Sequence, residues 1–264
     1  MTERFLTGKM IAFSISESTD LLRLGMSPRA LDHAVIEIAR YLLRAGAQIA
    51  YGGDLRKNGF TLQLIELVRR YRRDDPDTPP LHNYLTWSKH SVYPPGFLDE
   101  KAREYAGAAR IIPLDPYGEP MTSGEAPRAD SITSMTGMRT RVSNDCDARI
   151  VIGGKVNDFS GRCPGLMEEA ALTLERDKPV VLIGGFGGST RDMCSAIGFG
   201  KEWIRDDADV KPDFKECYEY GKSLVVEAAS KHREALPSQN EILADSRNLP
   251  EIIRQTLAGL HSVG

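Results

Sequence analysis

Pairs of glycines follow three short apolar runs of the chain, and their backbone N–H groups could hold a phosphate. The runs QIAY (48–51), RIVI (149–152) and PVVLI (179–183) continue as GGD, GGK and GGFGG. Glycine lets a ligand approach the backbone closely, and a helix that begins after such a loop favours an anion. A plain turn would explain one such pair, but three pairs favour a nucleotide or another phosphorylated ligand. The glycines that we expect at this site are Gly52, Gly53, Gly153, Gly154, Gly184, Gly185, Gly187 and Gly188.

Two charged side chains near the second glycine pair could recognise or cleave a nucleotide. Glu169 lies early in a predicted helix and could act as an acid at a sugar carbon or a nucleobase, or merely favour the helix dipole. The adjacent Glu168 would point in another direction, so we expect the two carboxylates not to act together. Arg139 could turn into the crevice and bind a phosphate or a carboxylate, or lie on a solvated helix face.

Other polar residues at predicted strand ends and in loops could contact the same ligand. Ser14 and Ser16 end the first apolar run, and their hydroxyls could line a nucleotide crevice or belong to a turn. Asp54 could accept a ribose hydroxyl or cap a turn. Arg162 is a second candidate for a phosphate contact, in the loop that ends at Pro164 and Gly165. Pro164 and Gly165 complete the set of expected binding residues.

Alternating strands and helices must position these side chains. Apolar runs predict strands at 9–14, 48–51, 81–87, 110–114, 148–152 and 179–183. Helical patterns predict helices at 29–44, 60–73, 98–106, 131–144 and 163–175, the first with an N-cap at Ser27-Pro28 and a C-cap at Gly46. This order predicts an α/β, Rossmann-like, doubly wound fold with a mainly parallel sheet and helices on both faces. Residues 1–200 would form the nucleotide-binding domain, and residues 201–264 a helical C-terminal extension of the same domain.

Composition and spacing argue against several other classes of protein. The net charge of −3 gives no reason to expect nucleic-acid binding, although RRYRRDD (69–75) leaves single-stranded DNA conceivable. The chain has no long uncharged apolar run and its N-terminus has no secretion signal, so we expect a cytoplasmic protein. The five histidines and four cysteines have no metal-binding spacing. We therefore expect free thiols, no metal site and no cofactor.

Five motifs, taken together and in order, resemble the SLOG superfamily of Rossmann-like domains. They are IAFSIS (11–16), IAYGGDLRKNGFT (49–61), MRTRVSNDCDARIVIGG (138–154), PGLMEEA (164–170) and KPVVLIGGFGG (178–188). The superfamily includes the LOG phosphoribohydrolases, the DNA-processing Smf/DprA proteins and the sensor domains of TRPM channels. The LOG enzymes carry a PGGxGTxxE motif preceded by an arginine. By this resemblance the glycine loop would hold a 5′-phosphate, and Arg139 and Glu169 would be the catalytic residues of N-glycosidic cleavage.

The LOG motif is split in this chain, and the split changes which function the resemblance implies. Residues 155–163 separate the glycine pair from Pro164, and Leu166 replaces the threonine. The longer loop resembles sensor-like branches, some of them proposed to recognise ADP-ribose or its cyclic forms beside TIR or Sir2 effectors in bacterial antiviral systems. The resemblance thus implies a homo-oligomeric sensor of a NAD-derived nucleotide with a TIR or Sir2 effector as partner. The alternatives are a nucleotide N-glycosidic hydrolase and a single-stranded DNA-binding protein.

Overall fold

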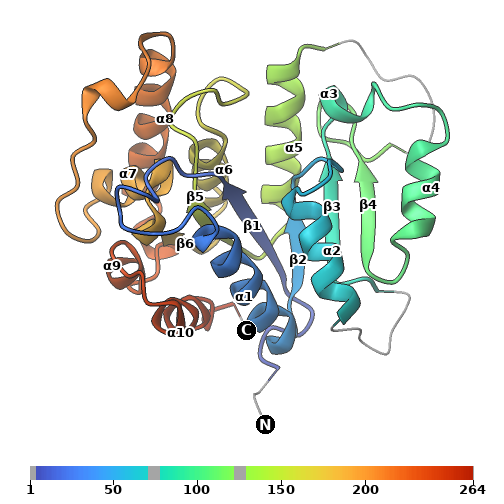
Figure 1. The fold of residues 1–264 in the computed structure, drawn as a ribbon, viewed down its shortest axis with the longest axis horizontal. Helices are drawn as coiled ribbons and strands as arrows, with labels where there is room; N and C mark the ends of the chain where they lie inside the picture. The colour runs from blue at the N-terminus through green and yellow to red at the C-terminus, as the bar shows by residue number, and fades with distance from the viewer. Residues whose placement is uncertain (1–3, 71–77, 122–128, 264) are drawn as a thin grey trace.

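Six parallel strands form one central sheet in the described part of the computed structural model (Figure 1). The structure describes residues 4–70, 78–121 and 129–263. The strand order is β4-β3-β2-β1-β5-β6. The strands are β1 (Met10–Ser16), β2 (Gln48–Tyr51), β3 (Leu81–Leu85), β4 (Ala109–Pro113), β5 (Ala148–Gly153) and β6 (Val180–Ile183). The predicted Rossmann-like α/β fold is confirmed.

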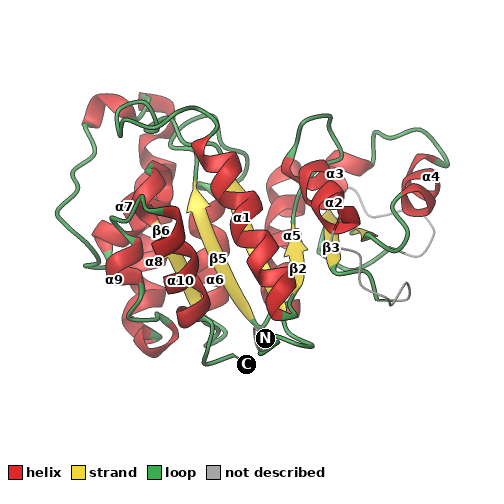
Figure 2. Cartoon of the chain, turned by 60° about the horizontal axis from the view of Figure 1, so that its bottom comes forward, coloured by secondary structure: helices red, strands yellow, loops and turns green. Residues whose placement is uncertain are grey.

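Helices cover both faces of this sheet, as Figure 2 shows from a second direction. One face carries α1 (Ala30–Ala45), α2 (Phe60–Arg70) and α10 (Leu249–Gly259). The other carries α5 (Ser131–Asp145) and α6 (Gly165–Leu174), with α8 (Pro212–Lys231) packed against α6. Helix α7 (Gly188–Ala196) follows β6 and packs against α6 and α8. The arrangement is doubly wound.

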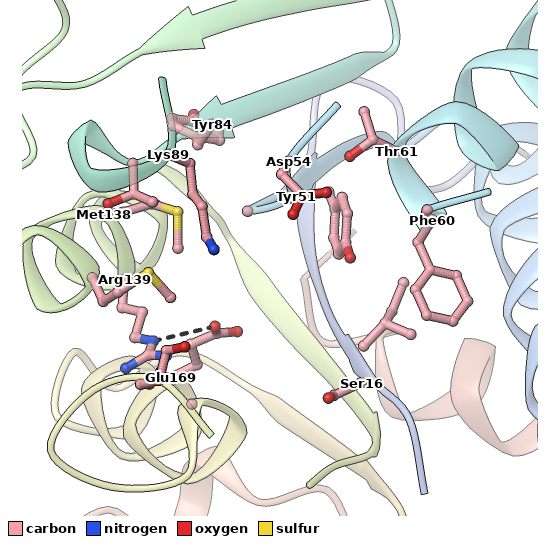
Figure 3. A pocket seen from close by; sticks show the side chains of 18 of the residues that line it. Ser16, Tyr51, Asp54, Phe60, Thr61, Tyr84, Lys89, Met138, Arg139 and Glu169 are labelled. Atoms are coloured by element: carbon pink, nitrogen blue, oxygen red, sulfur yellow. Dashed lines mark hydrogen bonds and ion pairs between the residues drawn. The ribbon is translucent and has the colours of Figure 1, made fainter. Parts of the chain in front are cut away.

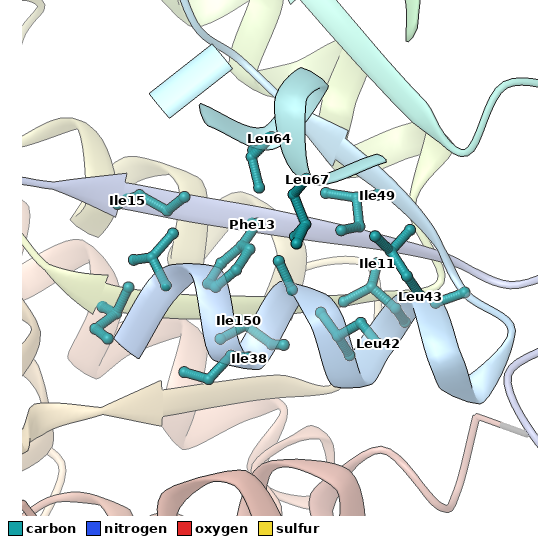
Figure 4. Close-up of a cluster of buried hydrophobic side chains, with 14 of the residues drawn as sticks. Ile11, Phe13, Ile15, Ile38, Leu42, Leu43, Ile49, Leu64, Leu67 and Ile150 are labelled. Carbon is teal, nitrogen blue, oxygen red and sulfur yellow. The ribbon is translucent and has the colours of Figure 1, made fainter. Parts of the chain in front are cut away.

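The alternation of side chains along β1 explains the two faces. Ile11, Phe13 and Ile15 point to the face of α1 and join the largest apolar cluster (Figure 4). Ala12 points the opposite way, where it packs with Met138 of α5. Successive strand residues alternate between faces, so one apolar strand supplies both cores. The small residue on the second face gives α5 room to lie close to the sheet.

The chain reverses its direction of travel across the sheet beside β1. It moves outward from β1 to β4, then returns through α5 to place β5 on the other side of β1. Ser16 at the end of β1 pairs in register with Gly153 at the end of β5. In open α/β sheets, ligands bind outside the carboxyl ends of the strands at such a reversal.

The segment after residue 200 packs on the same sheet. Asn240, the first residue of α9 (Asn240–Leu243), covers the free edge of β6 with its side-chain amide. It accepts a hydrogen bond from Leu182 N and donates one to Val180 O, each at 2.9 Å. An uncovered edge strand would invite pairing with another chain, so this side chain protects the edge. Short 3-10 turns, Gly184–Phe186, Asp207–Asp209 and Arg233–Ala235, complete this half of the fold.

Some predicted element ends differ from the structure. Helix α1 begins at Ala30 with Arg29 as its N-cap and no capping side chain, so the N-cap predicted at Ser27-Pro28 was wrong. Its C-cap is Gly46, in the left-handed conformation with φ 104°, as predicted. The third strand ends at Leu85, where a strand to residue 87 was predicted.

Residues near the end of β3 instead form a short helix that the sequence pattern did not reveal. Trp87–His90 is α3, and Phe97–Glu104 is α4. Thr86 turns the chain because its hydroxyl donates to Ser134 O on α5 at 2.9 Å. Part of the arginine run at 69–75 lies outside the described residues, as do residues 122–128. None of the helices in the described ranges is long and apolar enough to cross a membrane.

Candidate functional site

A cavity of about 280 Å³ lies over the C-terminal ends of β1, β2 and β3 (Figure 3). Helix α5 and the start of α6 form one wall, and the residues that follow β2 form the opposite wall. Several residues that the sequence predicted for the site are brought together here. They are Ser16, Gly52, Gly53, Asp54, Arg139, Gly165 and Glu169.

Glu169 lines this cavity, and two residues of the sheet hold its carboxylate. Its Oε2 accepts hydrogen bonds from the Ser14 hydroxyl and from Arg149 Nη1, the latter at 3.0 Å. Its Oε1 lies 3.7 Å from Arg139 Nε. Ser14 lies beneath the cavity and reaches the site through this carboxylate. One carboxylate oxygen is thus engaged by the protein, and the other makes no hydrogen bond within the described residues.

Arg149 holds the Glu169 carboxylate in the candidate site, and the sequence did not predict it there. It lies on β5 with 1% of its surface exposed. Its Nε donates to Thr173 Oγ1 at 2.6 Å, its Nη1 to Ser14 Oγ at 2.6 Å and its Nη2 to Ser143 Oγ at 3.0 Å. The sequence contained an indication of this role, because an arginine inside an apolar strand that is covered on both faces must have buried partners.

Arg139 reaches the cavity wall, but most of its guanidinium is committed to the protein. Nη1 donates to Glu168 Oε2 at 2.5 Å and Nη2 to Ser160 O at 3.1 Å. A Cβ atom at Gly161 or Gly165 would lie 2.6 or 2.5 Å from this guanidinium, so a side chain at either position would displace the arginine from its present place. Nε is buried and makes no hydrogen bond to a described residue. The arginine is buried, in contrast to the solvated helix face that was its alternative.

Glu168 joins the same cluster from the side away from the cavity. It is fully buried and accepts from Thr136 Oγ1 and Arg162 Nε, each at 2.8 Å. A buried carboxylate requires such partners. Arg162 therefore pairs with Glu168 and lies over the Tyr220 ring, and it is not among the residues that line the cavity. The adjacent glutamates do point in different directions, yet Arg139 contacts both.

The loop at 155–163 is tied to the C-terminal segment. Asn157 donates to Asp209 O and accepts from Lys211 N, each at 2.7 Å. The Phe159 ring packs edge-on against Phe214 of α8, with 4.9 Å between ring centroids. Phe159 also lines the cavity, so α8 fixes part of the cavity wall from behind.

The residues after β2 are held by a second polar set. The Asn83 amide donates to Gly53 O, and the Thr61 hydroxyl donates to Asn83 Oδ1, both at 3.0 Å. Burial, followed by the nearby charges of Glu169 and Asp54, raises the pKa of Tyr51. Tyr51 therefore presents a neutral phenol to the cavity. Gly52, Gly53 and Asp54 lie in a wall with a fixed backbone.

The other predicted glycines serve close packing and do not line the cavity. A Cβ atom at Gly153 would lie 2.2 Å from Ser16 O, and one at Gly154 would lie 2.0 Å from Ser189 Oγ. At Gly185 it would lie 1.8 Å from Ser246 O. The structure thus separates Gly153, Gly154, Pro164, Gly184, Gly185, Gly187 and Gly188 from the cavity lining.

A carboxylate of the chain itself occupies the N-terminus of α7 that follows GGFGG. Asp20 Oδ2 accepts from Gly188 N and from Arg205 Nη2, both at 2.7 Å. Burial opposes ionisation of Asp20, but Arg205 and the Gly188 N–H outweigh it and hold its pKa below the ordinary value. The position where an anion was expected is therefore filled by Asp20.

A comparison of the sequence with models of known protein families places the chain in one of them. A family model described as SLOG cluster2 matches residues 5–251. The chain belongs to SLOG cluster2. No curated protein matches the chain. The family is one of nucleotide-related Rossmann-like domains, in agreement with a cavity at the strand ends. The match includes the sheet, α8 and α9.

No group of three or more metal-ligating side chains occurs within the described ranges.

Proposed function

We propose that this SLOG cluster2 protein is a nucleotide sensor that binds its ligand in the cavity over β1, β2 and β3. The observation that carries the proposal is that the protein itself makes most of the hydrogen bonds of the Glu169 and Arg139 side chains. Glu169 Oε2 accepts from Ser14 and Arg149, and two nitrogens of Arg139 donate to Glu168 and Ser160. Because the charges of Glu169 and Arg139 are already balanced by the protein, the two side chains are better suited to bind a ligand than to cleave it.

The proposed ligand is a NAD-derived nucleotide of the ADP-ribose or cyclic ADP-ribose class. Family membership and the aromatic side chains of Tyr51, Phe60 and Phe159 in the cavity wall support a ligand with a planar base. The volume of about 280 Å³ is at the small end of ligand sites, which commonly reach about 300–1,000 Å³. A cavity of this size would enclose one nucleotide unit and leave the remainder of a larger ligand outside.

Thermal unfolding with AMP, ADP-ribose, cyclic ADP-ribose and NAD tests the proposal. A ligand that binds only the folded chain stabilises it by about 2.7 kcal/mol at a hundred times its Kd. We expect a concentration-dependent rise in Tm with at least one of the four. Unchanged melting with all four would reject a sensor of this ligand class.

A second candidate, nucleotide N-glycosidic hydrolysis, rests on the two atoms that remain available. Glu169 Oε1 and Arg139 Nε lie 3.7 Å apart at the cavity, and neither makes a hydrogen bond within the described residues. A carboxylate so placed could donate or accept a proton at a leaving group. Chromatography would then find free base, and Glu169→Gln would abolish its release. Glu175→Gln, an exposed change on the helix end, is the matched control. Intact ligand after long incubation with wild type would count against the enzyme.

The proposal extends to assembly and signalling. The resemblance to sensor branches supports a homo-oligomer that acts with a TIR or Sir2 effector in a bacterial antiviral system. Light scattering with and without the stabilising nucleotide would measure the oligomeric state. A monomer under both conditions would contradict the assembly part of the proposal and leave nucleotide binding intact.

A further inference from the structure

The charged residues that line the cavity have partners in the protein, with one exception in the described chain. Arg56 pairs with Asp54 at 3.4 Å, and Lys155 with Glu17 at 3.9 Å. The other wall charges are paired as well, Asp158 with Lys211, Glu169 with Arg149 and Arg139 with Glu168. Lys89 lines the same cavity and makes no ion pair with any residue that the structure describes. Its positive charge is available to a ligand.

The backbone that carries Lys89 is fixed in place. Lys89 N donates to Thr86 O at 3.0 Å, and the Thr86 hydroxyl donates to Ser134 O on α5. On the other side, the buried His90 ring nitrogen Nε2 lies 2.8 Å from Leu114 O. These contacts tie α3 to α5 and to the turn after β4. The lysine side chain is exposed, but the backbone that carries it is held over the cavity.

Figure 3 shows how Lys89 lies relative to the other walls. Its Nζ points into the cavity from the same side as Met138 and Arg139. Tyr51 and Phe60 lie across the cavity from it. A ligand that satisfies both sides carries an anionic group at one end and a planar apolar group at the other. This division matches the phosphate and the base of a nucleotide.

We propose that Lys89 binds the phosphate of the ligand, and that the charge contact lies at α3 instead of at the glycine loops that follow β5 and β6. The inference rests on the proposed nucleotide-binding function and adds the residue and the ligand group that meet. The glycine segment at 184–188 is not available for this role, because Asp20 occupies the N-terminus of α7. The glycine pair after β5 is closed by Ser16 and Ser189. An ammonium group on a flexible stem suits a point contact to a phosphate oxygen.

Calorimetric titration of wild type, Lys89→Ala and Lys57→Ala tests this assignment. The ligands are adenosine and whichever of AMP and ADP-ribose binds wild type more tightly. Lys57 is the matched control, an exposed lysine near the cavity that is not among its lining residues. We expect Lys89→Ala to weaken the phosphate-bearing ligand about tenfold or more, the effect of losing one charged contact, and to leave adenosine unchanged. Lys57→Ala should bind both ligands as wild type does.

Three results would overturn the inference, and they are separable from failure of the proposed function. Unchanged affinity of Lys89→Ala for the phosphate-bearing ligand rejects the contact while nucleotide binding stands. If Lys89→Ala weakens the binding of adenosine equally, Lys89 contributes to the shape of the cavity and does not contact the phosphate. If wild type binds neither AMP nor ADP-ribose, the inference fails, and the proposed function fails with it only when cyclic ADP-ribose and NAD also leave the melting temperature unchanged. The melting temperature of Lys89→Ala should equal that of wild type, since the side chain is exposed and makes no ion pair within the described residues.

Discussion

Arg149 Nη1 and Glu169 Oε2 lie 3.0 Å apart and join the sheet to the wall of the cavity. The arginine comes from β5 and the glutamate from α6, and Ser14 of β1 contacts both. The strands β1 and β5 and the helix α6 thus meet in one polar group beside β1, where the chain reverses its direction across the sheet. Since Arg149 is also held by Thr173 and Ser143, the position of the Glu169 carboxylate is set by the fold and does not depend on a ligand.

Removal of the Arg149 guanidinium should destabilise the fold strongly. Arg149→Met removes the guanidinium that donates to Glu169, Ser143 and Thr173. Loss of one partner of a buried pair costs about 3–5 kcal/mol. Urea denaturation at neutral pH would measure the loss. Arg141→Met is the matched control, because Arg141 is partly exposed and its pairs with Asp145 and Glu119 should contribute about 1 kcal/mol or less. Equal stability of the two variants would contradict the role assigned to Arg149.

Most of the fold could be predicted from the sequence, because hydrophobic periodicity reflects burial directly. Runs such as RIVI and VVLI are buried on both faces, which is typical of strands in a parallel sheet that helices cover on both sides. Helix α3 was not predicted, since four residues are too few to show a period and the turn depends on the contact of Thr86 with Ser134. Lys89 was missed for the same reason.

The candidate site could be predicted where a residue's role depends on its place at a strand end. Ser16, Asp54 and Glu169 meet at the cavity because parallel strands end at one edge of the sheet. Spacing could not show that Asp20, distant in sequence, fills the N-terminus of α7. Nor could it distinguish glycines required for close packing, such as Gly185 against Ser246, from glycines that face a ligand.

Asp20 should make stability depend on pH in the acid range. Its pKa is lowered in the folded state, so its contribution is complete above the unfolded pKa of about 3.9 and is lost as pH falls through the folded pKa. We expect Asp20→Asn to lower stability at pH 7 by about 3 kcal/mol, since Arg205 and Gly188 N lose a buried carboxylate. Below pH 4 the difference from wild type should shrink.

Denaturation at pH 7, 5, 4 and 3 would follow this difference. Glu66→Gln is the control, because its pair with Arg70 is exposed on both sides and its loss should change stability by about 0.5 kcal/mol or less. A constant difference between Asp20→Asn and wild type at all four values would show that Asp20 does not contribute through its charge.

The four cysteines should differ sharply in reactivity. Cys217 is exposed, whereas Cys146, Cys163 and Cys194 are buried. Burial raises the pKa of Cys163 and of Cys194 to about 12, so neither carries appreciable thiolate near neutral pH. Alkylation with iodoacetamide at pH 8, followed by peptide mass spectrometry, should label Cys217 first and the other three only on unfolding. Rapid labelling of Cys163 in the folded chain would contradict its burial.

Loosening the contact between α8 and the loop should alter the cavity from behind. Phe214→Ala removes the ring that packs against Phe159 and should cost about 0.5–1.5 kcal/mol beyond the lost burial. We expect faster hydrogen exchange at 156–162 and weaker binding of whichever nucleotide stabilises wild type, since Phe159 lines the cavity. Leu224→Ala is the matched control, a partly buried apolar change on the same helix without a described contact to the loop. If both variants raised exchange in the loop equally, general loosening of α8 would explain the effect, and the Phe159–Phe214 contact would not be what holds the cavity wall.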